Sequence, residues 1–498
     1  MMTKKGAAWL LLPIIAAGAC LRLVAFGGLV GTDDAMYADL AHRVISGQFL
    51  STHSMDLGTF PLRVGVFAPA ALAFRLFGIG EAALVVYPFL ISLLSIYLAF
   101  LAGRMFFGER AGIIAAILHA CLPFDVRYST LLFPDLIAAF WTNASILLLY
   151  RASKEAAVLT QIAQGLLCGL ALGVAWLCKE SILFSLPFVG FYLLWSIYKQ
   201  RRSAGLAVAV AAGFSAVLIG ESFIYYVYLS DPLYHLHALE RHNQMPAATV
   251  WFWNPAAPWS GGLLGRLLRD GPQVMLLNTE FGLTTAVAVL SIAYGIFRGC
   301  RSIWFVAAWF LYHVFIFNFG SHSLRSYMPL PAWEHRYFYP LLLPATLLVA
   351  VLLDSLLRRR DPAQLVTSER LFWGFTLAFI LVLGHAHGLY RDLKTKDVSY
   401  VERGLARMLS PGTPLYTDSR TAWLLRFFWS YPTKPATVDF AGMQASEIPP
   451  GAYVFVNPGR VEVVRHYGYR PPAFLDAAPA GWVPRWESGP ARLYQVPN

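Results

Sequence analysis

Long apolar runs constrain this chain more than any other feature. An α-helix needs roughly 20 mostly apolar residues to cross the hydrocarbon core of a bilayer. About eleven such runs cover residues 8–28, 82–102, 110–124, 132–150, 160–178, 181–198, 205–228, 281–298, 302–320, 337–353 and 371–390. Only 13% of the 498 residues are charged, against about 25% in a typical soluble protein. The sequence therefore predicts an all-α polytopic membrane protein.

The charges between the runs predict how the chain is oriented, because cytoplasmic loops carry an excess of Lys and Arg. If Lys4 and Lys5 are cytoplasmic, the same side receives Arg104 and Arg110; Arg151 and Lys154; Lys199, Arg201 and Arg202; Arg298 and Arg301; and Arg358, Arg359, Arg360 and Arg370. If residues 64–79 also crossed the membrane, every later loop would change sides and the basic loops would no longer be cytoplasmic. We therefore expect that short stretch, which contains Arg75, to form a helix that lies in the membrane interface or re-enters the membrane.

The composition changes near residue 391. The stretches "PLYTDSRTAWLLRFFWSY", "ATVDF", "AYVFVN" and "ARLYQVPN" are typical of short strands around a helix, joined by Pro- and Gly-rich turns. We predict a membrane domain over 1–390 and a small extracytoplasmic α/β domain over 391–498. The membrane domain includes a first outer loop, 29–81, and a second, 229–280.

The same features argue against several classes of function. The net charge of +11 comes from short clusters between apolar runs, not from a basic face interleaved with aromatic residues, so no nucleic-acid partner is expected. The chain has no Walker A loop and no convincing dinucleotide-binding fingerprint. The five cysteines lie in or beside apolar segments at no metal-ligand spacing, and we expect them to pack as small hydrophobes.

Ionisable groups at a membrane are costly and are therefore functional candidates. In the predicted orientation most of them fall on the outer side. They are Asp33, Asp34, Tyr37, His42 and Arg63; Asp125, Arg127 and Asp135; Lys179 and Glu180; and Glu334, His335, Arg336 and Tyr337. This one-sided clustering predicts an outward-facing polar cavity.

The adjacent carboxylates Asp33 and Asp34 admit two interpretations. The structural one is a helix start, with Thr32 or Asp33 as N-cap and Gly47 as the C-terminal stop. The functional one is an acid/base site at the membrane surface.

Other polar groups also have structural alternatives. Arg22 near the end of the first run can reach the interface along its aliphatic stem, and Asp125 can pair with Arg127. The group His235, His237, Glu240 and His242 has only partial metal-like spacing and fits an exposed loop. Trp251, Trp253 and Trp259 fit interfacial anchors as well as a stacking surface for a sugar or isoprenoid.

The order of several short motifs resembles one family of membrane enzymes. Arg22 late in the first run is followed by "DDAMYADLA", "PLRVGVFAPAALAFRLFG", "RMFFGERAGIIAAIL", "YSTLLFPDLIAAFWTNASILLLYRA", "CKES" and "HRYFYPLLLPA". This order is similar to that of the polyprenyl-phosphate-sugar-dependent glycosyltransferases of the GT-C fold. The likeness is greatest to the bacterial branch related to protein O-mannosyltransferases and the lipid A aminoarabinose transferase. It extends over roughly residues 8–390.

The resemblance implies roles for individual residues. It places the catalytic carboxylate at Asp33. Asp34, where the family usually has Glu, is predicted as a second catalytic residue that positions the acceptor or its partner loop. It implies donor-phosphate binding by Arg63, Lys179, Arg336 and Tyr337, although the family often has Lys at the position of Arg63. It also carries the acidic residue that opens a later span onto Asp135. Tyr37, Arg127, Glu334 and His335 complete the predicted substrate-binding set, and a divalent metal stays an open alternative.

The implied donor is a sugar on a polyprenyl phosphate, held beside the bilayer. The acceptor hydroxyl, on a glycolipid, polysaccharide or protein, must lose a proton as it attacks, and a carboxylate can take it. Cations would neutralise the departing phosphate, and attack from the opposite face predicts inversion. The expected location is the outer side of the bacterial cytoplasmic (inner) membrane. The alternatives are a transporter or flippase of lipid-linked sugars, a non-catalytic assembly protein, and a diphosphate-donor transferase of the O-antigen-ligase type.

Overall fold

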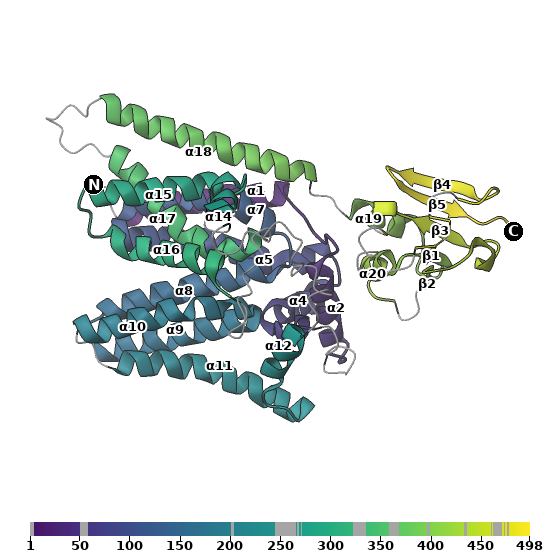
Figure 1. The fold of residues 1–498 in the computed structure, drawn as a ribbon, viewed down its shortest axis with the longest axis horizontal. Coiled ribbons are helices and arrows are strands. Elements are labelled where there is room, and N and C mark those ends of the chain that lie inside the picture. Colours follow the sequence, from purple (N-terminus) through teal and green to yellow (C-terminus); the bar gives the residue numbers. More distant parts are fainter. Residues whose placement is uncertain are drawn as a thin grey trace.

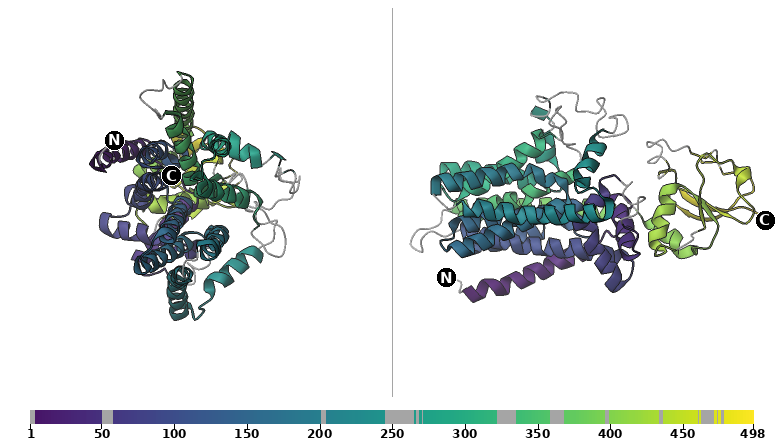
Figure 2. Two further views of the ribbon diagram at one scale, coloured as in Figure 1. Left: turned by 90° about the vertical axis from the view of Figure 1, so that its left-hand side faces the viewer. Right: turned by 90° about the horizontal axis from the view of Figure 1, so that it is seen from below.

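The helices form a long bundle with a small sheet domain at one end (Figure 1). The structure is a computed structural model that describes residues 4–49, 58–200, 204–244, 265, 268–269, 271–321, 335–357, 368–395, 399–432, 436–459, 461, 471–472, 474–475 and 478–498. The N-terminus lies at one end of the bundle. Helices α2, α4 and α12 lie at the other end, next to the sheet domain (Figures 1 and 2).

A helix lies over each predicted apolar run. These helices are α1 (Lys4–Val24), α5 (Glu81–Phe107), α6 (Glu109–Ala120), α8 (Pro134–Lys154), α9 (Val158–Cys178), α10 (Leu186–Gln200), α11 (Gly205–Leu229), α15 (Gly282–Phe297), α16 (Ile303–Phe319), α17 (Leu342–Leu357) and α18 (Ser368–Thr395). Within the described ranges, six segments are long and apolar enough to cross a membrane. The pair α14 (Gly271–Leu277) and α15, bent by 101°, would make a seventh. The chain is thus a multi-pass membrane protein, and the total of about eleven crossings stays a prediction.

Shorter helices cover the end of the bundle near the sheet domain. They are α2 (Asp33–Ile45), α4 (Val64–Phe77), α7 (Pro123–Tyr128) and α12 (Tyr234–Gln244). Helix α4, the predicted interfacial helix, packs against α2, α5 and α9. It buries Phe67 and Phe74 and leaves Leu72, Leu76 and Phe77 exposed. An apolar outer face is the feature expected of a helix at a membrane interface.

Glycines allow two of the long helices to pack closely. A Cβ atom at Gly169 of α9 would lie 2.1 Å from the Val210 carbonyl oxygen of α11. At Gly213 of α11 it would lie 2.3 Å from the Leu166 oxygen of α9. Gly165, Gly169 and Gly173 of α9, at four-residue spacing, all face α11. Small residues at this spacing bring helix backbones together in membranes, where lipid provides little hydrophobic drive for association.

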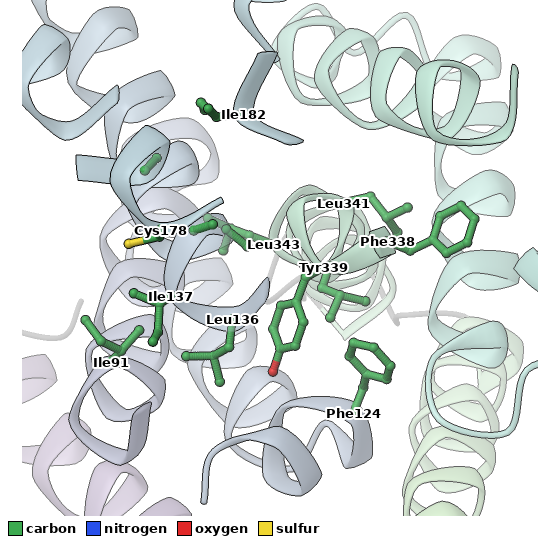
Figure 3. Close-up of a cluster of buried hydrophobic side chains, with 14 of the residues drawn as sticks. Ile91, Phe124, Leu136, Ile137, Cys178, Ile182, Phe338, Tyr339, Leu341 and Leu343 are labelled. Carbon is green, nitrogen blue, oxygen red and sulfur yellow. The ribbon is translucent and has the colours of Figure 1, made fainter. Parts of the chain in front are cut away.

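Helix α17 lies in the centre of the bundle. Most of its side chains are buried, and it follows directly from the 3-10 helix η5 (His335–Leu341). Figure 3 shows Tyr339 of η5 between Phe124 and Leu136, with Phe338 and Leu341 nearby. A helix that is apolar on every face belongs in the core. Its burial therefore holds the preceding residues His335, Arg336 and Tyr337 against the bundle.

The sheet domain, here called the C-terminal domain, is described between residues 399 and 498. Its elements are α19 (Tyr400–Met408), β1 (Leu415–Thr417), α20 (Ser419–Phe428), β2 (Thr437–Asp439), β3 (Tyr453–Val456), β4 (Val483–Ser488) and β5 (Ala491–Gln495). The strand order is β2-β1-β3-β5-β4. Strand β1 pairs in parallel with β2 and β3, and β5 pairs antiparallel with β3 and β4.

The predicted strands and helix of this domain are confirmed, but helix α19 and strand β4 were not predicted. Strand β4 lies at the edge of the sheet, carries Pro484 and has mostly exposed side chains. Pro is tolerated at a sheet edge but gives no strand signal. The domain boundary at residue 391 stays a prediction.

Candidate active site

Asp33 lies in the first turn of α2 and faces a cation from a distant part of the chain. Its Oδ2 accepts a hydrogen bond from Arg336 Nη1 at 2.6 Å, although the two residues are 303 positions apart. The side chains of Asp33 and Arg336 are 27% and 15% exposed. This ion pair joins the start of α2 to η5.

A second ion pair lies beside the first. Asp135 occupies the first turn of α8, where Pro134 begins the helix and a carboxylate suits the helix dipole. It accepts a hydrogen bond from Lys179, the residue directly after α9. Arg336 Nε lies 3.9 Å from the other Asp135 oxygen. The Lys179 ammonium also sits 4.0 Å from the centroid of the Tyr337 ring, a cation–π contact.

A third ion pair joins the start of α4 to the residue after Lys179. Arg63 Nη2 lies 3.1 Å from Glu180 Oε2, and Arg63 Nη1 donates to the Tyr37 hydroxyl at 2.7 Å. Burial raises the pKa of the Tyr37 phenol, so the hydroxyl stays protonated. Burial alone would lower the pKa of Arg63, but the Glu180 carboxylate and Tyr37 raise it above its usual value. Glu180 was one of the outer-side polar residues, but the sequence predicted no role for it. Its position next to Lys179, a predicted phosphate-binding residue, is the sequence feature that could have indicated one.

The three pairs form one electrostatic cluster. Asp135 joins two of the pairs, because its carboxylate accepts a hydrogen bond from Lys179 and lies 3.9 Å from Arg336 Nε. Asp135, Arg336 and Tyr337 line a common cavity with Thr142 and Ser185. The cluster of Arg63, Lys179 and Arg336 with Asp33, Asp135 and Glu180 has three formal positive charges and three negative ones. We call these six residues the charged cluster.

Asp34 has a different environment from its neighbour. It is buried, and its carboxylate accepts backbone N–H groups from Val30 at 2.5 Å, Thr32 at 2.7 Å and Gly31 at 3.4 Å. Burial raises the pKa of Asp34, and these backbone donors oppose that rise. The Asp34 oxygens hold the loop before α2, and a catalytic role for Asp34 stays a prediction. The helix-start interpretation also holds, since α2 follows Thr32 and ends before Gly47, which has a φ of 72°.

Two other predicted substrate residues lie against a neighbouring turn. Arg127 pairs with Glu280 between α14 and α15. His335 Nδ1 is hydrogen-bonded to Asn278 Nδ2 at 2.8 Å in the same turn. Arg127 and His335 therefore flank the charged cluster on the side of α15. Glu334 lies outside the described residues.

The structure corrects the interpretations of Arg22 and Asp125. Arg22 is fully buried and does not reach for the interface. It donates to Asp125 at 2.5 Å, to Ser92 at 2.6 Å and to the carbonyl oxygens of Gly18 and Ala120 at 2.9 and 3.0 Å. Asp125 consequently pairs with Arg22 and not with Arg127. Packing of α1, α5 and α7 around the guanidinium leaves it no path to water.

The histidine group gives no metal site within the described residues. His235 is buried, bonds Glu221 at 2.7 Å and stacks on Trp176. His237 bonds Asp231 at 2.9 Å. Throughout the described part of the chain, no set of three or more His, Cys, Asp or Glu side chains is placed to hold a metal ion. Trp251, Trp253 and Trp259 lie outside the described residues.

The sequence is similar to those of known membrane transferases. Residues 64–220 match the family model of dolichyl-phosphate-mannose-protein mannosyltransferases. An undecaprenyl phosphate-alpha-4-amino-4-deoxy-L-arabinose arabinosyl transferase of Aeromonas salmonicida is 24% identical over 379 residues, 72% of this chain and 63% of the relative. A Proteus mirabilis protein of the same description, numbered 2, is 23% identical over 270 residues, 50% of this chain and 49% of that relative. The chain thus spans less than two thirds of either relative.

Solved structures with a similar fold come from two groups of proteins. ArnT from Cupriavidus metallidurans in the apo state superposes with a TM-score of 0.57 at 15% identity, covering 98% of this chain and 97% of that one. The same protein bound to undecaprenyl phosphate gives a TM-score of 0.56 at 14% identity, covering 98% of both chains. The Archaeoglobus fulgidus oligosaccharyltransferase gives 0.59 at 14% identity, covering 97% of this chain and 73% of that one.

Proposed function

We propose that this protein, a multi-pass membrane protein of the GT-C fold, is a glycosyltransferase that uses a polyprenyl-phosphate-linked sugar donor. The family match and the names of the relatives support this class of reaction, and a protein of similar fold binds undecaprenyl phosphate. The observation that carries the proposal is the charged cluster. In it Arg336 pairs with Asp33 and approaches Asp135, the partner of Lys179, while Glu180, next to Lys179, pairs with Arg63. The proposed acceptor is a hydroxyl of a glycolipid, a polysaccharide or a protein.

Asp33 is the proposed general base. As the acceptor oxygen attacks the anomeric carbon, its proton passes to the Asp33 carboxylate, and the bond from that carbon to the phosphate oxygen breaks. One displacement from the face opposite the phosphate inverts the anomeric configuration.

Arg336 links donor binding to the freeing of this base. Its guanidinium donates a hydrogen bond to the Asp33 carboxylate. A phosphate is a strong competing partner for a guanidinium, because the planar donor fork matches its oxygens. Donor binding at Arg336 would therefore release the Asp33 carboxylate to accept a proton.

The other two cations act on the leaving group. Lys179 and Arg63 can stabilise the charge that develops on the departing polyprenyl phosphate. Their carboxylate partners, Asp135 and Glu180, keep them in place before the donor arrives. A cluster with balanced charges avoids burying excess positive charge while the site is empty.

The site is proposed to face the outer side of the bacterial cytoplasmic membrane. Basic residues mark the ends of several helices that run away from the charged cluster: Arg104 in α5, Arg151 and Lys154 in α8, and Lys199 in α10. These chain directions put them at the end that holds the N-terminus (Figure 1). This polarity agrees with a cytoplasmic location for that end. The family model, the two relatives and the Archaeoglobus fulgidus protein reported above are transferases by name, which gives the flippase alternative no support.

A reconstituted assay tests the reaction class. Purified full-length protein in lipid vesicles, given polyprenyl-phosphate sugars of the pentosyl and hexosyl types and cell-envelope extracts as acceptors, should release polyprenyl phosphate. Mass spectrometry of envelope glycolipids and glycoproteins, with and without the gene, then identifies the sugar and the acceptor. Release from polyprenyl-diphosphate donors alone would overturn the proposed donor class, and transbilayer movement of donor without sugar transfer would favour the flippase.

We expect Arg63→Ala to weaken binding of polyprenyl phosphate by about tenfold or more, since a charge-assisted hydrogen bond contributes roughly 1.5–3 kcal/mol. Binding can be measured by native mass spectrometry in detergent. Glu180→Gln is the matched control, because it removes the partner of Arg63 and leaves the cation. It should keep or increase the affinity. Equal affinities in the parent and Arg63→Ala would remove the phosphate role from Arg63.

A further inference from the structure

We infer that the C-terminal domain positions Asp33, through an ion pair between Arg403 and Glu81 and a hydrogen-bonded contact between Arg420 and Gly31. The effect on catalysis rests on the proposed function. The contacts reach the loop before Asp33, residues 27–32, here called the 27–32 segment. They reach it directly at Gly31 and indirectly through Glu81, which accepts the Leu29 N–H. Figure 1 shows the C-terminal domain next to α2, which begins directly after this segment.

Glu81 connects the C-terminal domain to the backbone of the 27–32 segment. It is the first residue of α5, and its Oε1 accepts the Leu29 N–H at 2.9 Å. Arg403 of α19 donates to both oxygens of the same carboxylate, from Nη2 to Oε1 at 2.7 Å and from Nε to Oε2 at 2.9 Å. This two-pronged geometry restrains both partners. The side chains of Arg403 and Glu81 are 21% and 19% exposed, so solvent screens the pair only in part.

Arg420 and Leu424 of α20 make the second contact. The Arg420 guanidinium donates to the Gly31 carbonyl oxygen through Nε, at 3.1 Å, and through Nη2. One turn later on the same helix, Leu424 lies so near that a Cβ atom on Gly31 would be 2.8 Å from its Cδ1. The C-terminal domain thus touches the chain two residues before Asp33.

The two glycines of the segment with positive φ lie at these contacts. Gly28 has a φ of 69°, and a Cβ atom there would lie 2.3 Å from Glu81 Oε1. Gly31 has a φ of 79° beside Leu424. Each position needs a left-handed backbone conformation and space for a neighbouring side chain. Glycine meets both needs, because it adopts positive φ without strain and has no Cβ atom.

Hydrogen bonding accounts for every backbone N–H of the segment. The N–H groups of Gly27 and Gly28 donate to Thr130, at 2.8 and 3.0 Å. The Leu29 N–H donates to Glu81, and the next three donate to Asp34, a carboxylate adjacent to the segment itself. Beyond Leu29, Arg420 and Leu424 therefore contact the segment from outside, directly before Asp33.

Support of this kind affects the chemical step more than donor binding. A base must be held within hydrogen-bond reach of the acceptor, and a displacement of about 1 Å can cost about 100-fold in rate. Neither Arg403 nor Arg420 belongs to the charged cluster, so each is a positioning residue. Loss of either should lower kcat while affinity for polyprenyl phosphate stays nearly constant.

Hydrogen exchange of the full-length protein tests the contact without requiring turnover. In Arg403→Ala, amide exchange in peptides covering residues 27–34 should increase about tenfold, with exchange in α8 and α9 unchanged, as expected for a local opening. The exchange rate in Arg403→Lys should lie between those of the parent and of Arg403→Ala, because one ammonium cannot match both carboxylate oxygens. Arg407→Ala is the matched control, since Arg407 lies one turn later on α19 and is exposed. Unchanged exchange in Arg403→Ala, or the same increase in Arg407→Ala, would overturn the inference.

Turnover assays then test the catalytic consequence. We expect kcat of Arg403→Ala to fall about 10- to 100-fold, with affinity for polyprenyl phosphate within about twofold of the parent. If Arg403→Ala does not fold, Arg420→Ala tests the same inference through the Gly31 contact, with the same exchange and kinetic readouts. A parent protein without transferase activity on any donor would refute the proposed function. The exchange result would still show whether Arg403 restrains the 27–32 segment. Normal kcat with raised exchange would refute the positioning role alone.

Discussion

Replacing Asp33 with Asn will reduce the rate of sugar transfer by roughly 10²–10⁴, the range that a positioned general base contributes. Asn has nearly the same shape as Asp but cannot take the proton of the acceptor hydroxyl. It also lacks the charge that holds Arg336 in the described ion pair. Binding of polyprenyl phosphate should therefore be kept or become tighter. Parallel measurements of kcat with saturating donor and of lipid-phosphate affinity separate these two effects.

Asp34→Asn is the matched comparison for this prediction. Because the Asp34 carboxylate accepts three backbone N–H groups, its loss should raise amide exchange at residues 30–32 and lower the thermal stability of the protein. Asp33→Asn should change neither quantity appreciably, since Asp33 is partly exposed and its partner is a side chain. Near-normal turnover by Asp33→Asn would remove the general-base role from Asp33. Loss of turnover in Asp33→Asn together with loss of folding would leave Asp33 a structural residue.

Removing either partner of the Arg22–Asp125 ion pair will destabilise the protein by about 3–5 kcal/mol, because the remaining charge stays buried without compensation. Both side chains are inaccessible to solvent. Ser92 and Tyr339 add hydrogen bonds to the same carboxylate, so the pair links α1 and α5 to η5. Asp125→Leu and Arg22→Met should each lower the midpoint of thermal unfolding in detergent.

The double variant distinguishes two causes of destabilisation: a buried charge without its partner, and the loss of side-chain packing at these two positions. Replacing a buried ion pair with apolar residues of similar volume is often neutral or stabilising. The combination Arg22→Met with Asp125→Leu should therefore be more stable than either single variant. Additive losses in the double variant would contradict this account and would indicate that packing volume decides the effect.

The sequence determined the architecture because hydropathy is a local property. Each apolar run became a helix, and the change in composition after the last run marked the C-terminal domain. The missed strand β4 illustrates the limit of the method, since an exposed edge strand needs little apolar pattern and takes its conformation from its partner β5.

The tertiary structure decided which charges meet. Nothing in the local sequence separates Asp33 from Asp34, yet one faces Arg336 and the other holds its own loop. Arg22 near a span end has the pattern of an interfacial residue, but packing of neighbouring helices buries it against Asp125. A charged side chain takes its partner from the helices packed around it, and that packing brings together residues up to 303 positions apart. The sequence therefore determined where the helices form and which polar residues they carry, and the packing of those helices decided the ionic partner of each one.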